Sequence, residues 1–379
     1  MKIYFKNLDG LRFAAAFLVI MQHASDYRSY AVPTYSNVFK AHFADLGRYG
    51  VTLFFVLSGF LISYLLLAER KTTNTINIKK FYIRRILRIW PLYFAFGILV
   101  ICTIDLVLQN FGIYDHSPIL TNLIYLFTFT VNFQLLFGAY NRGIIEVLWS
   151  VCVEEQFYAI WPWAIKWGYK KIRTLIFVFI GIGILSSVVM HLLTENGFIH
   201  GHMNPVYIFP LCRFGHFGIG ALAAYLLFDE KQYAKIAPFI KNKAIQAGMI
   251  LLVLLISLHF IVFPHFVDNY FLDMVPAILY AYIILAAVSG NFLVNLETNL
   301  IKRMGTYSYG IYIIHPSVGQ ISIAIFKKYV PNGFINYEIL FPLFVTVLSV
   351  SLAGLSYELY EKRFLLLKKK FTIIQNHPV

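Results

Sequence analysis

An arginine and a histidine interrupt the first apolar stretch of the chain, 8-LDGLRFAAAFLVIMQHA-24. His23 follows Arg12 by eleven positions, and eleven steps of about 100° make about three turns, so a helix carries both on one face. The rise between them is about 16 Å, roughly half of a bilayer core. An imidazole moves protons near neutral pH, and a guanidinium binds anions. The pair therefore predicts the polar lining of a path through a membrane.

A second polar stripe lies in 148-LWSVCVEEQFYAIWP-162, where Ser150, Glu154 and Tyr158 are spaced i, i+4, i+8. In the topology derived below, Glu154 lies about 10 Å from the outer edge of its span, near the predicted depth of His23. A carboxylate beside an imidazole can orient its tautomer and stabilise its charged form during proton transfer. We therefore expect Glu154 to contact His23, and Ser150 and Tyr158 to help bind a substrate.

Further ionisable residues occupy later apolar stretches: Arg213 and His216 within 206–228, and His315 within 305-GTYSYGIYIIHPSV-318. A charged side chain in hydrocarbon costs roughly 2.5–3.5 kcal/mol, so it needs a partner or a water-filled cavity. For any one of these residues, a structural contact that fixes helix packing is an equal alternative. Their convergence at similar depths favours a functional site, with Arg213 and His315 as candidates for substrate binding.

The segment 54-FFVLSGFLI-62 places Ser58 and Gly59 in mid-membrane. Glycine allows helices to approach closely, and a helical serine usually bonds to a carbonyl of its own helix or bridges two helices. The chain shows no GxSxG elbow, which argues against a standard serine triad. We therefore favour a structural role for Ser58 over that of a nucleophile.

The stretch 84-RRILRIWPLY-93 carries Arg84, Arg85 and Arg88 directly before a tryptophan and a proline. Guanidinium groups bind phosphates in a bidentate manner, and aromatic rings can stack on a planar base. Cytoplasmic arginines also anchor membrane helices beside interfacial aromatic residues. The spacing alone favours the anchoring role.

The composition indicates which elements must position these residues. Of 379 residues, 59% are hydrophobic and 13% are charged, against about 45–50% and about 25% in soluble globular proteins. The excess runs along the whole chain, so we predict an all-α, polytopic bundle of membrane helices. No cleavage site follows the N-terminus, and the first apolar stretch should remain as a helix.

Charge and cysteine usage exclude two other classes of protein. The net charge of +14 fits basic cytoplasmic loops, and we expect no nucleic-acid partner. The three cysteines, Cys102, Cys152 and Cys212, lie in apolar runs without metal-ligand or disulfide spacing. We therefore expect buried free thiols and no metal site.

The apolar runs predict ten membrane-spanning helices, because a bilayer core takes about 20 residues. An eleventh run, 122–137, is shorter and is broken by polar residues. The predicted spans are 8–29, 50–68, 90–110, 147–167, 174–194, 206–228, 245–263, 271–290, 305–326 and 338–361.

Basic residues predict the orientation of these spans. Five basic clusters, the first at 69–89, fall on the cytoplasmic side only if 122–137 does not cross the membrane. We therefore predict that 122–137 is re-entrant or interfacial and that both termini are cytoplasmic, although Lys327 and Lys328 then fall on the outer side. The membrane domain should cover residues 1–366, and residues 367–379 should form a short basic tail.

The order of these motifs resembles the acyltransferase family 3 of bacterial integral membrane acyltransferases. The resemblance runs from Leu8 to about Arg363 and so covers most of the chain. It is based on DGLR followed after ten residues by a histidine, and on FFVLSGFLI, RRxxRIxPLY, WSVCVEEQFYxxWP and a late GxYSYxIYxxHP segment.

The resemblance implies transfer of an acyl group, usually acetyl, from cytoplasmic acyl-CoA to a hydroxyl of an extracytoplasmic or membrane-associated acceptor. Acceptors in the family include the O-antigen of lipopolysaccharide, exopolysaccharide, peptidoglycan, lipid-linked glycans and some small metabolites. It further implies a multi-pass protein of the bacterial cytoplasmic (inner) membrane, surrounded by lipids and without a bound cofactor. We expect no SGNH-type soluble domain after Val379. The residues that match family motifs are Arg12, His23, Ser58, Gly59, Arg84, Arg85, Arg88, Trp149, Ser150, Glu154, Tyr307, Ser308 and His315.

The residues and the resemblance together favour direct acyl transfer. We expect His23 to take the proton of the acceptor hydroxyl, with Glu154 orienting it, while Arg12 and the arginines at 84–88 bind the CoA phosphates. An acyl-enzyme on His23 or Ser58 stays open. A secondary transporter or flippase with a buried proton relay is the alternative class, although the chain lacks clear repeated halves. A non-enzymatic scaffold would not explain why several ionisable residues lie at similar depths in the membrane.

Overall fold

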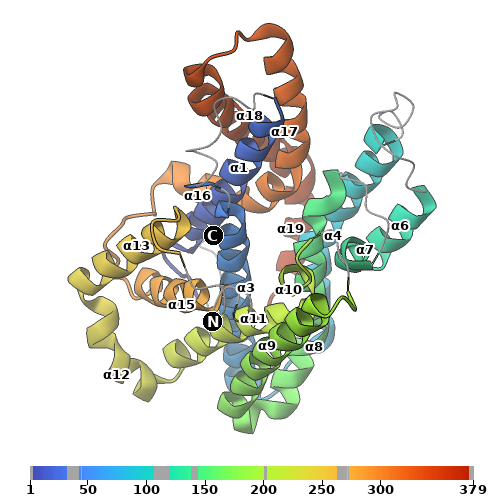
Figure 1. Cartoon of the computed structure of the whole chain (residues 1–379). Helices are drawn as coiled ribbons and strands as arrows, with labels where there is room; N and C mark the ends of the chain where they lie inside the picture. The colour runs from blue at the N-terminus through green and yellow to red at the C-terminus, as the bar shows by residue number, and fades with distance from the viewer. Residues whose placement is uncertain are drawn as a thin grey trace.

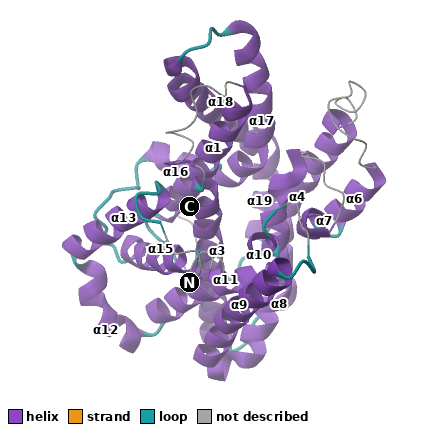
Figure 2. Ribbon diagram, in the orientation of Figure 1, coloured by secondary structure: helices purple, strands orange, loops and turns teal. Residues whose placement is uncertain are grey.

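The computed structural model describes residues 3–31, 42–43, 45–105, 119–137, 144–199, 203–262, 271 and 273–374. Over these residues the chain forms helices and turns and no strand (Figure 1, Figure 2), which confirms the predicted all-α class. Residues 106–110, 263 and 272 of the predicted spans, and 375–379 of the predicted tail, lie outside the described residues. The α-helices are α1 (Leu8–Ala31), α3 (Leu46–Thr73), α4 (Ile78–Leu99), α6 (Ile119–Phe127), α7 (Val131–Phe137), α8 (Trp149–Gly168), α9 (Ile172–Glu195), α10 (Pro205–Ile208), α11 (Pro210–Phe228), α12 (Glu230–Lys241), α13 (Lys243–Ser257), α15 (Met274–Val288), α16 (Asn299–Thr306), α17 (Ser308–Tyr329), α18 (Phe341–Ser356) and α19 (Lys362–Lys369).

Six continuous helical stretches of the described chain are long and apolar enough to cross a membrane, or seven if the bent pair α12–α13 counts as one span. One of the six, Ile145–Glu195, has 51 residues, and about 77 Å of helix is more than twice a bilayer core. It comprises α8 and α9, which part at the 3-10 turn Tyr169–Lys171. The prediction of ten spans is not confirmed. Helix α1 is long enough, but its polar residues lower its hydropathy, and α13 and α15 have only 15 residues each.

The run 122–137 forms two short helices, α6 and α7, which are joined by a turn. They have 9 and 7 residues, and helices of about 14 and 11 Å are too short to cross a bilayer core. Gln134 of α7 donates a hydrogen bond to the side-chain oxygen of Asn122 in α6 at 2.6 Å. This buried contact ties the two helices together where they pack against α4 and α8.

Helix α3 lies at the centre of the bundle and contacts α1, α8, α11 and α15 (Figure 1). Its close approach to α11 depends on two glycines. A Cβ on Gly59 would meet the backbone carbonyl of Phe217, and a Cβ on Gly220 would meet that of Val56. Small residues let membrane helices pack backbone to backbone. This packing fixes the position of Ser58, the neighbour of Gly59.

Helices α1, α17 and α18 form a second group, which Figure 1 shows together at one end of the molecule. A buried ion pair joins Arg28 of α1 to Glu338 in the π-helical segment Ile335–Leu340 that leads into α18. Removal of either partner would leave an uncompensated buried charge. The pair therefore holds the C-terminal part of α1 against the α17–α18 hairpin.

The cysteines are free thiols, and two of the three are buried as predicted. Cys152 and Cys212 lie inside the bundle, whereas Cys102 is exposed, so the expectation of burial is wrong for Cys102. A membrane helix is apolar on its lipid-facing side as well as toward its neighbours. An apolar run therefore does not reveal which of its residues are buried.

Candidate active site

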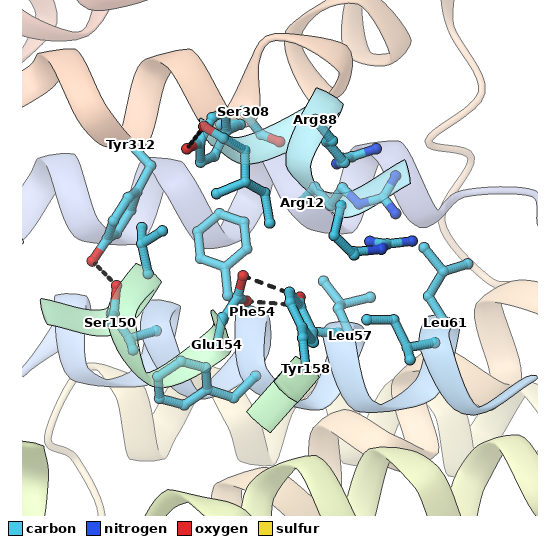
Figure 3. A pocket seen from close by; sticks show the side chains of 18 residues that line it. Arg12, Phe54, Leu57, Leu61, Arg88, Ser150, Glu154, Tyr158, Ser308 and Tyr312 are labelled. Carbon is cyan, nitrogen blue, oxygen red and sulfur yellow. Dashed lines mark hydrogen bonds between the residues drawn. The ribbon is translucent and has the colours of Figure 1, made fainter. Parts of the chain in front are cut away.

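A cavity of about 90 Å³ lies where α1, α3, α4, α8 and α17 converge (Figure 3). Figure 3 shows Arg12 and Arg88 toward one end, the contact between Ser150 and Tyr312 at the other, and Glu154 between them. Eight of the fourteen predicted site residues line this cavity. They are Arg12, Ser58, Arg85, Arg88, Ser150, Glu154, Tyr158 and Ser308.

Glu154 places a carboxylate in the middle of the cavity. Its Oε1 accepts a hydrogen bond from the Ser58 hydroxyl at 2.7 Å, and its Oε2 accepts one from the Tyr158 hydroxyl at 3.2 Å. The expected contact with His23 is not among the contacts of Glu154 within the described chain. Glu154 instead orients two cavity hydroxyls, and Ser58 bridges α3 to α8 through it, as a helix-bridging serine does.

Two arginines face the cavity without an acidic partner. Arg85 and Arg88 line it, and neither forms an ion pair or a hydrogen bond within the part of the chain that the structure describes. The Arg85 guanidinium lies over the ring of Tyr158, 5.6 Å from its centroid. Arg12 differs, because Asp9 pairs with it at 2.6 Å. An uncompensated buried cation is costly, so this end of the cavity suits an anionic ligand.

Arg84, which the motif groups with Arg85 and Arg88, does not line the cavity. Its guanidinium pairs with the buried Glu69 at 3.3 Å and donates a hydrogen bond to the backbone oxygen of Phe371 at 3.1 Å. Arg84 therefore ties α4 to α3 and to the segment after α19. Its partners give it a structural role that the other two arginines lack.

Two hydroxyl groups close the other end of the cavity. The hydroxyls of Ser150 and Tyr312 lie 2.6 Å apart, and Tyr312 donates to the backbone oxygen of Val147 at 3.1 Å. The Ser150 hydroxyl lies 3.5 Å from the same backbone oxygen; because the Tyr312 contact to it is shorter and a hydroxyl has one proton, we assign the Ser150 proton to Tyr312. The sequence reasoning missed Tyr312 and Tyr309, which both line the cavity. The i, i+4 spacing of Ser308 and Tyr312 in the late motif was the signal that could have found Tyr312.

His23 and His315 form a pair beyond Tyr312, outside the cavity lining. Their rings lie 5.1 Å apart, and the His315 ring lies 5.9 Å from that of Tyr312. The Nδ1 of His315 is 2.7 Å from the backbone oxygen of Tyr312, so Nδ1 carries the proton and Nε2 can accept one. This Nε2 is buried and has no partner among the described residues. His23, which is half-buried, has its Nδ1 3.9 Å from the Asp26 carboxylate.

Three other predicted site residues do not line the cavity and are not part of the histidine pair. Trp149 packs against Tyr207, with ring centroids 4.8 Å apart. Arg213 donates to the backbone oxygen of Tyr207 at 2.6 Å and pairs with the buried Asp273 at 3.3 Å. The charge of Arg213 is thus compensated, which supports its structural alternative. Tyr307 does not line the cavity either.

Comparisons with known proteins bear on this arrangement. The model of the acyltransferase 3 family, described as an acyltransferase domain, matches residues 5–358. Peptidoglycan O-acetyltransferase OatA of Listeria monocytogenes is 28% identical over 356 residues, which cover 87% of this chain and 51% of OatA. A Bacillus subtilis protein named "Putative peptidoglycan O-acetyltransferase YrhL" is 27% identical over 376 residues, which cover 95% of this chain and 54% of that protein.

The chain thus spans about half the length of the curated relatives it matches. No solved structure matches it. The family match includes every residue that lines the cavity and both residues of the histidine pair. With its apolar helices, the chain is a multi-pass membrane protein that belongs to the acyltransferase 3 family.

Proposed function

We propose that the protein is an O-acyltransferase that moves an acetyl group from acyl-CoA to a hydroxyl of a cell-envelope carbohydrate. The observation behind this proposal is the cavity. Its arginine end offers two cations without an acidic partner, Arg85 and Arg88, and its middle offers the hydrogen-bonded hydroxyls around Glu154. The cations suit the phosphates of acyl-CoA, and the hydroxyl network suits the thioester.

The donor enters at the arginine end of the cavity. Guanidinium groups bind phosphates, and basic residues favour the cytoplasmic side of a membrane protein, the side on which acyl-CoA is made. In this orientation both termini are cytoplasmic, and the pantetheine arm runs from Arg85 and Arg88 toward Tyr312. The cavity of about 90 Å³ is smaller than the roughly 150 Å³ that holds one benzene, so it must widen to admit the pantetheine arm, and we propose that the acyl group on that arm is short.

His23 is the base in this proposal. It lies about 16 Å along α1 from Arg12, so the thioester must pass Tyr312 to meet it. The acceptor oxygen attacks the thioester carbonyl carbon as its proton passes to His23. The carbon–sulfur bond then breaks, the acetyl ester forms, and the CoA thiolate takes up the proton. His315 can share that proton through its free Nε2.

A two-step route through Ser58 is the alternative within the same site. The Ser58 hydroxyl already donates to Glu154, a carboxylate that can take its proton during attack on the thioester. An acetyl-serine would form, CoA would leave as the thiol, and the acceptor would then take the acetyl group. Mass spectrometry of the protein after incubation with acetyl-CoA separates the routes, because only this one adds an acetyl group to Ser58.

The proposed acceptor class comes from the relatives. Two of them carry names of peptidoglycan O-acetyltransferases, so we propose peptidoglycan or its lipid-linked precursor ahead of exopolysaccharide or lipopolysaccharide. The membrane is then the bacterial cytoplasmic membrane. Because the chain spans about half of each relative, the proposal is confined to acyl transfer at the membrane.

Acetyl transfer by membranes that contain the protein tests this function. Wild-type membranes given labelled acetyl-CoA should form labelled ester on the glycan, and His23→Ala should lower the rate by about 100-fold or more. Wild-type transfer by His23→Ala would exclude His23 as the base. The transporter alternative predicts that purified protein leaves the thioester of acetyl-CoA intact, so acceptor-dependent release of CoA thiol would exclude a pure transporter.

A further inference from the structure

The C-terminal helix α19 lies against α4, the helix that carries the arginine cluster (Figure 1). Hydrogen bonds hold it at both ends. Before α19, the Tyr360 hydroxyl donates to the backbone oxygen of Pro91 in α4 at 3.2 Å. After α19, the backbone oxygen of Phe371 accepts a hydrogen bond from Arg84 at 3.1 Å. The position of α19 on α4 is therefore well defined.

This docking brings Lys368, in the last turn of α19, toward the arginine end of the cavity. The backbone oxygen of Lys368 accepts a hydrogen bond at 3.0 Å from the N–H of Phe371, the residue whose own backbone oxygen Arg84 holds. Arg88, Arg85 and Arg12 are among the charged neighbours of Lys368. Lys368 is half-buried, and the structure as described gives it no ion pair. A lysine has little reason to face several arginines unless an anion lies between them.

Within the part of the chain that the structure describes, three of the five cations near this end of the cavity lack an acidic partner. The five are Arg12, Arg84, Arg85, Arg88 and Lys368. Two of the arginines have a carboxylate partner, as described above, whereas Arg85, Arg88 and Lys368 form no ion pair among the described residues. Glu361 acts on the charge of Arg88 from a distance and instead accepts a hydrogen bond from a serine at 3.2 Å. Like charges repel strongly where water is scarce. A ligand with several negative charges would relieve that repulsion.

We propose that Lys368 binds a phosphate group of the acyl-CoA donor together with Arg85 and Arg88, and that α19 forms one wall of the donor site. This inference rests on the proposed function. CoA carries a pyrophosphate and a separate 3′-phosphate, which suits a cluster of several cations. A guanidinium holds phosphate oxygens in a fixed geometry, and a lysine adds a mobile point charge. Lys368 lies beyond the residues 5–358 matched by the family model, so it is not part of the family motifs.

Binding of CoA to the purified full chain in detergent tests this role. We expect Lys368→Ala to weaken CoA binding about tenfold and Lys368→Arg to retain most of the affinity. Lys369→Ala is the matched control, because Lys369 is the next residue and is exposed, and it should bind CoA like the wild type. The midpoint of thermal unfolding without ligand shows whether each variant is folded. If Lys368→Ala does not fold, the CoA affinity of Lys368→Arg relative to the wild type still tests the role of the side chain.

Dephospho-CoA, which lacks the 3′-phosphate, shows which phosphate Lys368 contacts. If it contacts the 3′-phosphate, Lys368→Ala weakens only CoA; if it contacts the pyrophosphate, both ligands weaken about tenfold. Equal CoA affinity of wild type and Lys368→Ala would overturn the inference and leave a lipid-anchoring role, while the proposed function stands. Absence of CoA binding by the wild type would overturn both.

Discussion

Separate replacement of Arg84 and Arg88 distinguishes folding from ligand binding within one helix. Arg88 lines the cavity and forms no ion pair among the described residues. Arg88→Ala therefore removes an uncompensated charge, and without ligand the free energy of unfolding should stay the same or rise by about 1–2 kcal/mol. Arg84→Ala leaves Glu69, which is only 2% exposed, without its cation. It should lower the free energy of unfolding by about 3–5 kcal/mol.

In ligand binding we expect the reverse: Arg88→Ala should lose affinity for CoA, and Arg84→Ala should keep it. Hydrogen bonds to a charged group contribute about 1.5–3 kcal/mol, so loss of the Arg88 contact to a phosphate should raise the Kd of CoA by about 10- to 150-fold. Arg84 is engaged by Glu69 and Phe371. Arg84→Ala should therefore change the Kd of CoA by less than about threefold once the loss of folded protein is counted.

Denaturant unfolding and calorimetric titration with CoA, both on purified protein in detergent, measure the two effects. The Arg88→Lys variant is the control for charge, because it keeps the cation but loses the bidentate geometry. The assignment would be refuted if Arg88→Ala lost stability and kept its affinity for CoA. It would fail equally if Arg84→Ala lost affinity at unchanged stability.

Three further substitutions, one of them with a matched control, test the site and the core. Glu154→Gln should lower the acyl-transfer rate at unchanged CoA affinity: by about 100-fold if Glu154 takes the Ser58 proton in the two-step route, and by about tenfold or less if Glu154 only orients the Ser58 and Tyr158 hydroxyls; a rate near wild type would remove Glu154 from the chemistry. His315→Ala should lower kcat and leave the Kd of acetyl-CoA unchanged, because the imidazole pairs with His23 at 5.1 Å; a raised KM at constant kcat would contradict this. Gly59→Ala should cost about 2 kcal/mol or more, because its Cβ meets the Phe217 carbonyl. Gly181→Ala, where a Cβ meets nothing within 4 Å, should be neutral or stabilise by up to about 1 kcal/mol, and equal unfolding midpoints for the two glycine variants would exclude the tight contact.

Helical spacing predicted polar faces better than it predicted what those faces contact. The stripe of Ser150, Glu154 and Tyr158 lines the cavity along its whole length. The same arithmetic placed Arg12 and His23 on one face, yet only Arg12 lines the cavity. A residue of another helix, Tyr312, separates the two, and no spacing within α1 could indicate that.

The ion-pair partners could not be predicted from the sequence, because they depend on tertiary packing. Arg84 and Arg88 are one turn apart in a single motif, but only Arg84 meets a carboxylate, on the preceding helix. Arg213 was expected at the site, and it is bound to Asp273, which lies 60 positions later in the chain.

The number of membrane spans was also poorly predicted, because hydropathy does not indicate where a helix ends. Apolar runs such as 245–263 and 271–290 are long enough to cross a membrane, yet the helices within them have 15 residues each. Hydropathy measures how apolar a run is and carries little information on where its helix begins and ends. The all-α class did not depend on those ends, and the structure confirms it.

The contact between Ser150 and Tyr312 also affects how well the membrane retains its proton gradient. A continuous wet path from Arg88 to His23 would leak protons, and each charge that crosses dissipates about 2.3 kcal/mol per 100 mV of membrane potential. With the two hydroxyls 2.6 Å apart, Tyr312 lies between the arginine-lined cavity and the histidine pair. Tyr312 is held there by two hydrogen bonds, one with Ser150 and one to the Val147 backbone, each with a net contribution of about 1 kcal/mol. In the proposed mechanism, an arriving thioester displaces contacts of that strength and they re-form when it leaves, so we expect the bilayer to stay sealed between turnovers.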